Sequence, residues 1–445
     1  MKNLITILFD KTQKQFYLVA FGYLALFVSI YYILYSCGII TAIPNSVNLI
    51  NWDANWYQSI RDKNYEYFWF MASNSAFFPL FSYCWKLLGL SSVGISVFNL
   101  FLFLVSLNLL YRTFSITQKQ LLLYLSLPSV LFFGVPMSES FFFFFCTLFL
   151  IGLKKDNVYL IVFGLLFASL TRATAMFFIP CILAMELTTC EKLFDKQCLK
   201  NILLYSFVSL LGLFIVVLIQ YAYTGVWFAF AKQQLRFWKH SFDLPTFPLV
   251  SHGGENTLWL DGTAFVMGFL FLFISIVLFF KKLINASRLN KDLLKDKSFF
   301  YSLYYVSVIT VYALFFNSKC MEAQTTIDSI SRYFFCTAFF VLAFTGIEKH
   351  LELSIKNYMI FLCVSLFGFY LIGLNGDPFH YFLKENSPLK LTYLLLAGMF
   401  VYINLFLFAG FNTKLSKITS VFILLVNVTV ATYCLNRFIQ GIYVG

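Results

Sequence analysis

The sequence predicts an all-α polytopic membrane protein with about 11–13 transmembrane helices. Of its 445 residues, 60% are hydrophobic and only 12% are charged, and the mean hydropathy is +0.80. Soluble domains carry roughly 25% charged residues, about twice this share. The apolar stretches also have helical length, and helices satisfy their own backbone polar groups inside lipid.

The chain contains about thirteen apolar stretches that could form transmembrane helices. We expect spans at 16–41, 93–113, 120–134, 137–153, 158–170, 175–186, 202–229, 263–280, 299–317, 333–347, 358–374, 391–410 and 418–436. The first is too long for the apolar part of a signal peptide, so we interpret it as a retained span. Several early spans are short for a bilayer of roughly 30 Å, and we expect these to surround a cavity or to begin below the surface.

The distribution of basic residues predicts the orientation. With the N-terminus inside, the inner segments hold 20 of the 32 Lys and Arg residues, and an odd number of spans places the C-terminus outside. Two outer segments, 42–92 and 230–262, are long. The stretch 52–70 is amphipathic and rich in Trp and Tyr, so we expect interfacial helices there. Phe77–Leu90 is either a half-helix that dips in from outside or the start of the second span.

Composition and motifs exclude several other classes of protein. The basic residues that give the net charge of +12 lie mainly in the predicted inner segments. We therefore expect membrane lipids, and no nucleic acid, as partners. The ten Cys residues form no CxxC pair, which argues against a zinc site or a disulfide framework. The outer loops contain no DxD motif, and the chain has no Gly-rich phosphate loop. No linker separates a soluble part, and we therefore expect residues 1–445 to form a single membrane domain.

The predicted spans hold no Asp, Glu, Lys or Arg in their interiors, so we expect any chemistry at the outer surface. Asp53 lies between Trp52 and Trp56 in the outer segment that follows the first span, and Tyr57 comes next. A carboxylate among aromatic rings at the interface can act as a general base for a lipid-borne substrate. The structural alternative is that Asp53 caps an interfacial helix within an ordinary aromatic belt.

Three more charged residues lie at the outer ends of predicted spans. Glu139 follows Ser138, so it is either a site residue or a helix-start acid favoured by the helix dipole. Arg172 occupies a very short turn that leaves it little freedom to reach the head groups. Arg332 precedes Tyr333 at the start of a span, where an interface anchor is the alternative to a role in the site.

A basic cluster in the second outer segment could bind phosphate. Arg236, Lys239 and His240 alternate with aromatic residues, and on a helix Arg236 would share a face with Lys239 or His240. Arg offers two parallel donors to a phosphate and Lys a point charge. Contact with anionic lipid is the alternative.

These motifs together resemble the PIG-V-type mannosyltransferases, the family of GPI mannosyltransferase II and its bacterial relatives. The similar segments are W-D-A-N-W-Y and A-F-F-P-L-F, then S-E-S-F, L-T-R-A-T and S-R-Y. Ala175 and Ser82 replace the Gly and Pro that the family commonly has. The resemblance implies a GT-C glycosyltransferase fold with long outer loops after spans one and seven. It also implies a catalytic module over 1–262, followed by variable helices over 263–445.

The resemblance further implies transfer of a hexose, mannose above all, from a polyprenyl-phosphate donor to a lipid, glycan or protein hydroxyl. Asp53 matches the family's catalytic acid, and Arg172 and Arg332 would hold the donor phosphate. Glu139, Trp52, Trp56, Tyr57 and Tyr333 would contact the acceptor or support these residues.

We expect inversion of the anomeric centre, no metal cofactor, and a location in a bacterial inner membrane with the site on the extracytoplasmic face. Scattered outer acids leave Mg²⁺ or Mn²⁺ open as an alternative. A transporter or flippase of lipid-linked sugar, or a non-catalytic component that binds a glycolipid, are the other functions that fit an apolar chain of this kind.

Overall fold

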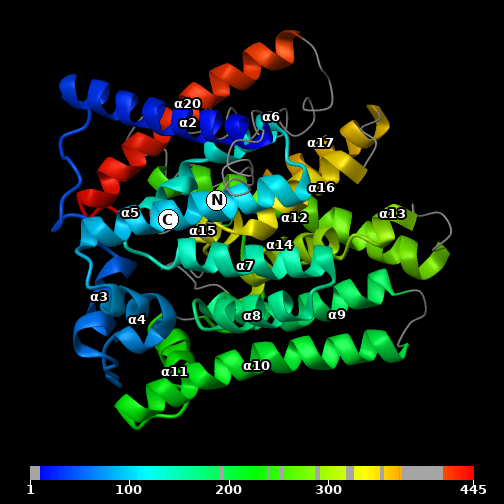
Figure 1. Cartoon of the computed structure of the whole chain (residues 1–445), viewed down its shortest axis with the longest axis horizontal. Helices are drawn as coiled ribbons and strands as arrows, with labels where there is room; N and C mark the ends of the chain where they lie inside the picture. The colour runs from blue at the N-terminus through cyan, green and yellow to red at the C-terminus, as the bar shows by residue number, and fades with distance from the viewer. Residues whose placement is uncertain are drawn as a thin grey trace, which may run out of the picture.

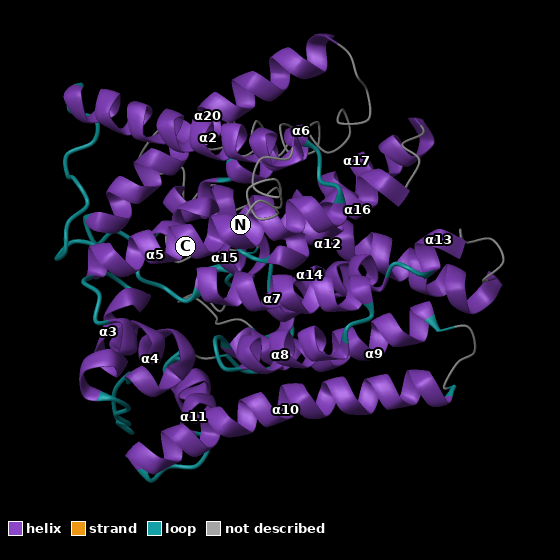
Figure 2. Ribbon diagram, in the orientation of Figure 1, coloured by secondary structure: helices purple, strands orange, loops and turns teal. Residues whose placement is uncertain are grey.

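The computed structural model describes residues 11–190, 195–238, 240–247, 249, 255–285, 291–316, 325–350, 355–369, 371–372 and 414–444. The regular elements in these ranges are helices (Figure 2). They are α2 (Lys11–Ser36), α3 (Asp53–Lys63), η1 (Asn74–Ala76), α4 (Pro79–Leu88), α5 (Ser92–Phe114), α6 (Gln118–Leu125), η2 (Pro128–Gly134), α7 (Glu139–Lys155), α8 (Val158–Ser169), η3 (Ala173–Phe177), α9 (Phe178–Thr189), α10 (Lys196–Thr224), α11 (Ala229–Arg236), α12 (Glu255–Asn285), α13 (Lys291–Leu294), α14 (Lys297–Phe315), α15 (Ile330–Phe335), α16 (Ala338–His350), α17 (Ile355–Phe369) and α20 (Lys414–Ile439).

Five described helices, in α2, α5, α10, α12 and α14, are long and apolar enough to cross a membrane. A sixth span results if η2 and α7, which meet at an angle of 99°, are counted as one broken crossing. This finding confirms a polytopic helical membrane protein. Helices also occupy the other predicted intervals in the described residues, and all of them except α20, which has 26 residues, are shorter. The count of 11–13 spans therefore stays a prediction. The interval 391–410 lies outside the described residues.

The local sequence explains where the helices begin and end. Asp195 caps α10 by accepting from the Cys198 N–H at 2.6 Å, and α10 ends at Gly225 with a left-handed φ of 67°. α4 begins with Pro79 in its first turn and ends at Gly89, which also has a left-handed φ. α4 is therefore a separate short helix, so Phe77–Leu90 is not the start of the second span.

The shorter helices α7, α8, α9 and α16 pack alongside the long helices α10 and α14 (Figure 1). α3, α4 and α11 are together at one end of the bundle, whereas α13 is at the opposite end. The two predicted outer segments meet there, because Gln233 of α11 donates to the Phe68 carbonyl at 2.7 Å. These two segments thus contact each other at one end of the bundle, and their location outside the membrane stays a prediction.

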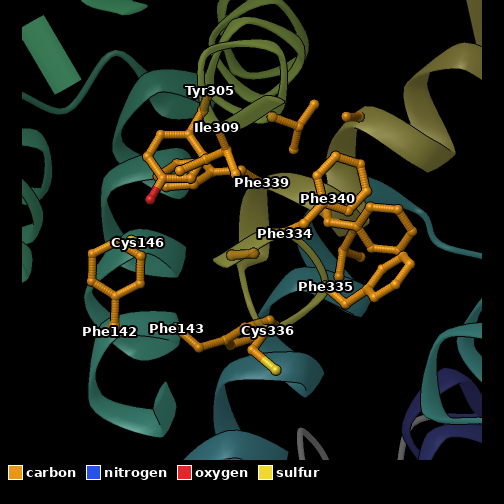
Figure 3. Packing of buried hydrophobic residues seen from close by; sticks show 14 of the residues in the cluster. Phe142, Phe143, Cys146, Tyr305, Ile309, Phe334, Phe335, Cys336, Phe339 and Phe340 are labelled. Atoms are coloured by element: carbon orange, nitrogen blue, oxygen red, sulfur yellow. The ribbon is translucent and has the colours of Figure 1, made fainter. Parts of the chain in front are cut away.

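Aromatic side chains fill the core between α7, α14, α15 and α16 (Figure 3). The rings of Tyr305 and Phe339 have centroids 4.2 Å apart, and those of Phe142 and Phe178 are stacked at 6.0 Å. Such ring pairs add stability beyond the area that they bury. Because α7 and α15 carry charged residues at their starts, this packed core holds those residues on rigid elements.

Candidate active site

Four charged residues from four separate parts of the chain meet at the end of the bundle where α3 lies. Asp53 is the first residue of α3, Glu139 begins α7, Arg172 precedes η3, and Arg332 is in α15. We call these four residues the charged cluster. All four were predicted from the sequence as site residues, and the structure brings them together.

Glu139 is at the centre of the charged cluster. Its Oε1 lies 2.6 Å from Arg172 Nη1, 2.6 Å from Arg332 Nη2 and 3.0 Å from Arg332 Nε. The Glu139 side chain is fully buried, whereas its Oε2 has no hydrogen-bond partner among the described residues. A single carboxylate oxygen therefore holds two guanidinium groups that would otherwise repel each other.

The start of α7 is fixed by neutral hydrogen bonds. Asn99 of α5 donates to the carbonyls of Val135 and Met137, at 2.8 and 2.9 Å, across the bend between η2 and α7. Ser138 makes no side-chain cap, and its hydroxyl instead meets the Tyr57 hydroxyl at 2.7 Å. Because of this bend, Glu139 at the start of α7 contacts both arginines and is more than an acid that favours a helix N-terminus.

Arg332 joins Glu139 to Asp53. Arg332 Nη1 lies 2.8 Å from Asp53 Oδ2, and the Arg332 guanidinium also lies over the Phe132 ring, 4.8 Å from its centroid. The Arg332 side chain is only 4% exposed, so it is not an interface anchor. Burial opposes its charge, but the Glu139 and Asp53 carboxylates more than offset this effect and hold the pKa of Arg332 well above its usual value.

Asp53 does not act as a helix cap. Trp52 precedes α3 as its cap residue, and no side-chain cap bond is present there. The Asp53 carboxylate is 29% exposed, compared with 0% for Glu139, so it is the acid of the pair that solvent or a ligand can reach. Two carboxylates and two guanidinium groups give the charged cluster a formal charge of zero.

A cavity of about 310 Å³ adjoins the charged cluster. It has the size of a small-molecule site. The residues that line it are Asp53, Tyr57, Ala76, Phe77, Phe78, Arg172, Ala173, Thr174, Met176, Phe177, Phe230, Ala231, Gln234, Leu235, His240, Tyr312, Phe316 and Tyr333. The lining therefore includes a carboxylate and a guanidinium, while most of the other lining side chains are aromatic or aliphatic.

The two arginines differ in their access to this cavity. Arg172 lines it, with its guanidinium 5.4 Å from the centroid of the Tyr333 ring. Arg332 is not among the described lining residues and lies behind Asp53. Of the two residues predicted to bind phosphate, Arg172 therefore reaches the cavity, whereas Arg332 contacts Asp53. A phosphate contact at either residue stays a prediction.

The basic cluster of the second outer segment is not arranged as predicted. α11 ends at Arg236, so a continuous helix does not place Arg236 and His240 on one face. Arg236 lies over the Trp69 ring at 5.7 Å and does not line the cavity in the described residues. Lys239 lies outside the described residues.

His240 does line the cavity, but its charge state differs from that of a phosphate-binding cation. Its Nδ1 lies 3.3 Å from the Phe316 carbonyl. Burial lowers the pKa of His240 below its usual value, although Phe316 and Asp328 act in the opposite direction. At neutral pH the imidazole is therefore uncharged and offers a hydrogen bond, not a positive charge.

The aromatic residues of the W-D-A-N-W-Y segment separate into two groups. Tyr57 lines the cavity and is packed edge-to-face against Phe77 at 5.2 Å. Trp56 stacks on Phe77 and meets the Trp238 ring edge-on, so it supports the wall without being among the described lining residues. Ser82, which stands where the family commonly has Pro, donates to the Tyr57 carbonyl at 2.9 Å and helps to fix α3 against α4.

Two further residues of this region were not predicted from the sequence. Gln234 brings an amide to the cavity wall from α11. Asp261 of α12 is fully buried, and its Oδ1 accepts the Ser331 N–H at 3.0 Å, beside Arg332. In the sequence, Asp261 is an acid at the edge of an apolar stretch, between Leu260 and Gly262, and this position could have marked it as a candidate.

Comparison of the chain with protein-family models, curated proteins and solved structures found no match. The resemblance to PIG-V-type enzymes therefore remains a prediction from the sequence motifs. Among the described residues, no group of three or more His, Cys, Asp or Glu side chains could hold a metal ion.

Proposed function

We propose that the protein is a membrane glycosyltransferase that moves a hexose from a polyprenyl-phosphate donor to an acceptor hydroxyl at the extracytoplasmic surface. The observation that supports this proposal most directly is that Asp53 and Arg172 face the same largely apolar cavity. A carboxylate and a guanidinium are the groups needed to accept a proton and to stabilise a departing phosphate. Mannose is the sugar that the family resemblance favours.

The proposed reaction is a single displacement. The acceptor oxygen forms a bond to the anomeric carbon while the bond from that carbon to the phosphate oxygen breaks. The hydroxyl proton passes to the Asp53 carboxylate, and the electron pair of the broken bond leaves with the polyprenyl phosphate. The anomeric centre is thereby inverted.

We give the two arginines different parts in this reaction because their positions differ. Arg172 reaches the cavity and would bind the phosphate, whose negative charge grows as the bond breaks. Arg332 holds Asp53 Oδ2 at 2.8 Å and so orients the base. Glu139 keeps both arginines in place through Oε1.

The apolar wall suits the lipid part of such a donor. Met176 and Leu235 line the cavity and are also 41% and 57% exposed, so the cavity borders an apolar outer surface of the protein. The first isoprene units could lie along this side while the phosphate meets Arg172.

The test is transfer by the purified protein from a short-chain polyprenyl-phosphate hexose to acceptors extracted from the native membrane. Mass spectrometry should find a hexose-bearing product together with polyprenyl phosphate. The same product should be missing from membrane glycolipids or glycoproteins of cells without the gene. A protein that moves the intact donor across vesicles, or binds it without turnover, would contradict the proposal and support the flippase or binding alternatives.

A further inference from the structure

Two residues with a left-handed backbone precede the helices that carry Asp53 and Arg332. Trp52, with a φ of 54°, comes directly before α3, and Ser329, with a φ of 59°, comes directly before α15. Such φ values are uncommon in residues other than glycine and persist where surrounding contacts hold them. The contacts of these two residues therefore help to set the directions of both helices.

Tyr443, in the segment after α20, contacts both of these residues. Its hydroxyl lies 2.6 Å from Ser329 Oγ, and its ring meets the Trp52 ring edge-on with centroids 5.1 Å apart. Asp53 and Arg332, which belong to the same two helices, form an ion pair with Nη1 and Oδ2 2.8 Å apart. The two helices are therefore linked both through Tyr443 and through this ion pair. One side chain thus connects the starts of two helices that are distant in the sequence.

Neighbouring contacts attach the same part of the chain to the segment that leads into Asp53. Asn436 of α20 accepts from the backbone N–H groups of Thr41 and Ala42, each at 3.3 Å. Asn51 donates to the Phe438 carbonyl at 3.0 Å. Tyr443 therefore extends a set of hydrogen bonds and is not an isolated contact.

We propose that Tyr443 is a positioning residue that aligns the Asp53 carboxylate with the Arg332 guanidinium at the edge of the cavity. Tyr443 is not among the described residues that line the cavity, so it acts through Trp52 and Ser329. Its effect on turnover rests on the proposed function, whereas its effect on the ion pair does not.

The first experiment measures the ion pair without an activity assay. Asp53→Ala is introduced into the wild-type protein and into Tyr443→Phe, Tyr443→Ala and Ile442→Ala, and the melting temperature of each purified protein is measured. Tyr443→Phe removes only the hydroxyl, and Ile442→Ala is the matched control because it shortens an exposed neighbour. In contacting networks, effects of two substitutions are not additive.

We expect the melting-temperature decrease caused by Asp53→Ala to be at least halved in Tyr443→Ala, intermediate in Tyr443→Phe and unchanged in Ile442→Ala. Equal decreases in all four backgrounds would overturn the proposal. If Tyr443→Ala does not fold, the comparison of Tyr443→Phe with the wild type decides.

The second experiment measures turnover per folded molecule in the transfer assay. Because misplacement of a reacting group lowers rate more than binding, kcat should fall about 10- to 100-fold in Tyr443→Ala while the KM for the donor stays within about twofold. An unchanged kcat per folded molecule would contradict a positioning role. If the wild type shows no transfer, the proposed function fails, and the melting-temperature comparison still decides the role of Tyr443.

Discussion

Arg172 and Arg332 bind the same Glu139 oxygen, yet only Arg172 faces the cavity. We expect Arg172→Lys to weaken donor binding, because a single ammonium replaces the planar fork that can donate two hydrogen bonds to phosphate. A hydrogen bond to a charged group contributes roughly 1.5–3 kcal/mol. Loss of one such bond should therefore raise the KM for the donor about 10- to 150-fold.

Arg332→Lys should instead lower kcat, since the lysine cannot hold both Glu139 and Asp53 in the same geometry. Steady-state kinetics with a short-chain donor measures both variants, because the contacts involve the phosphate region and not the lipid tail. An Arg172→Lys enzyme with wild-type kinetics would remove Arg172 from the donor site. The same result for Arg332→Lys would show that orientation of Asp53 does not limit turnover.

The chemistry of the leaving group gives a second prediction at this scale. A single phosphodiester can be stabilised by guanidinium groups, so we expect transfer to continue in EDTA. The assay is transfer by the purified protein before and after chelation. Loss of activity with EDTA and recovery with Mn²⁺ would reject this mechanism and reassign Asp53 as a metal ligand.

At the scale of elements, α10 holds the loop that forms one side of the cavity. Gln220 of α10 donates to the Ser75 carbonyl at 2.8 Å and accepts the Phe230 N–H at 3.0 Å. Gln220 is fully buried, so water cannot replace it readily. Gln220→Leu should leave these backbone groups without partners, and each such group costs about 1–3 kcal/mol.

We therefore expect Gln220→Leu to lower the melting temperature and to expose the segment 64–78 to proteolysis. Gln197→Leu is the matched control, because Gln197 lies at the other end of α10 where the side chain is exposed. Equal protease resistance of the wild type and Gln220→Leu would contradict this role of Gln220.

The sequence could predict the helices and most of the charged cluster, but not how the cluster is connected. Apolar length located the helices, and charged residues at their ends were few enough to single out Glu139, Arg172 and Arg332. That Arg332 bonds to Glu139 across 193 positions depends on helix packing, which local patterns do not encode. The same limitation hid the contact of Tyr443 with Ser329.

The second outer segment shows why a local pattern can also mislead. The spacing of Arg236 and His240 suggested a shared helix face, but α11 stops at Arg236 and the chain turns. The Arg236 guanidinium then lies over Trp69, a contact that depends on how two loops are folded together.

At the scale of the whole molecule, the orientation in the membrane stays a prediction that labelling can test. The Lys and Arg distribution places the end with α3, α4 and α11 outside and the end with α13 inside. In a protein whose native cysteines have been replaced, we expect an impermeant maleimide to label Ser241→Cys in intact cells. Lys295→Cys, which is also exposed, should be labelled only after the membrane is opened. The reverse pattern would overturn the topology and the proposed extracytoplasmic site.

The central claim is that Asp53 accepts the proton of the acceptor hydroxyl, and Asp53→Asn tests it most directly. The amide keeps the size of the side chain and an oxygen that can accept from Arg332, but it cannot take up the proton. Loss of a general base lowers the rate roughly 10²- to 10⁴-fold. We predict that purified Asp53→Asn folds and binds a short-chain polyprenyl-phosphate hexose like the wild type while turnover falls by this factor. Near-normal turnover in the same preparation would contradict the account and leave Asp53 as a structural partner of Arg332.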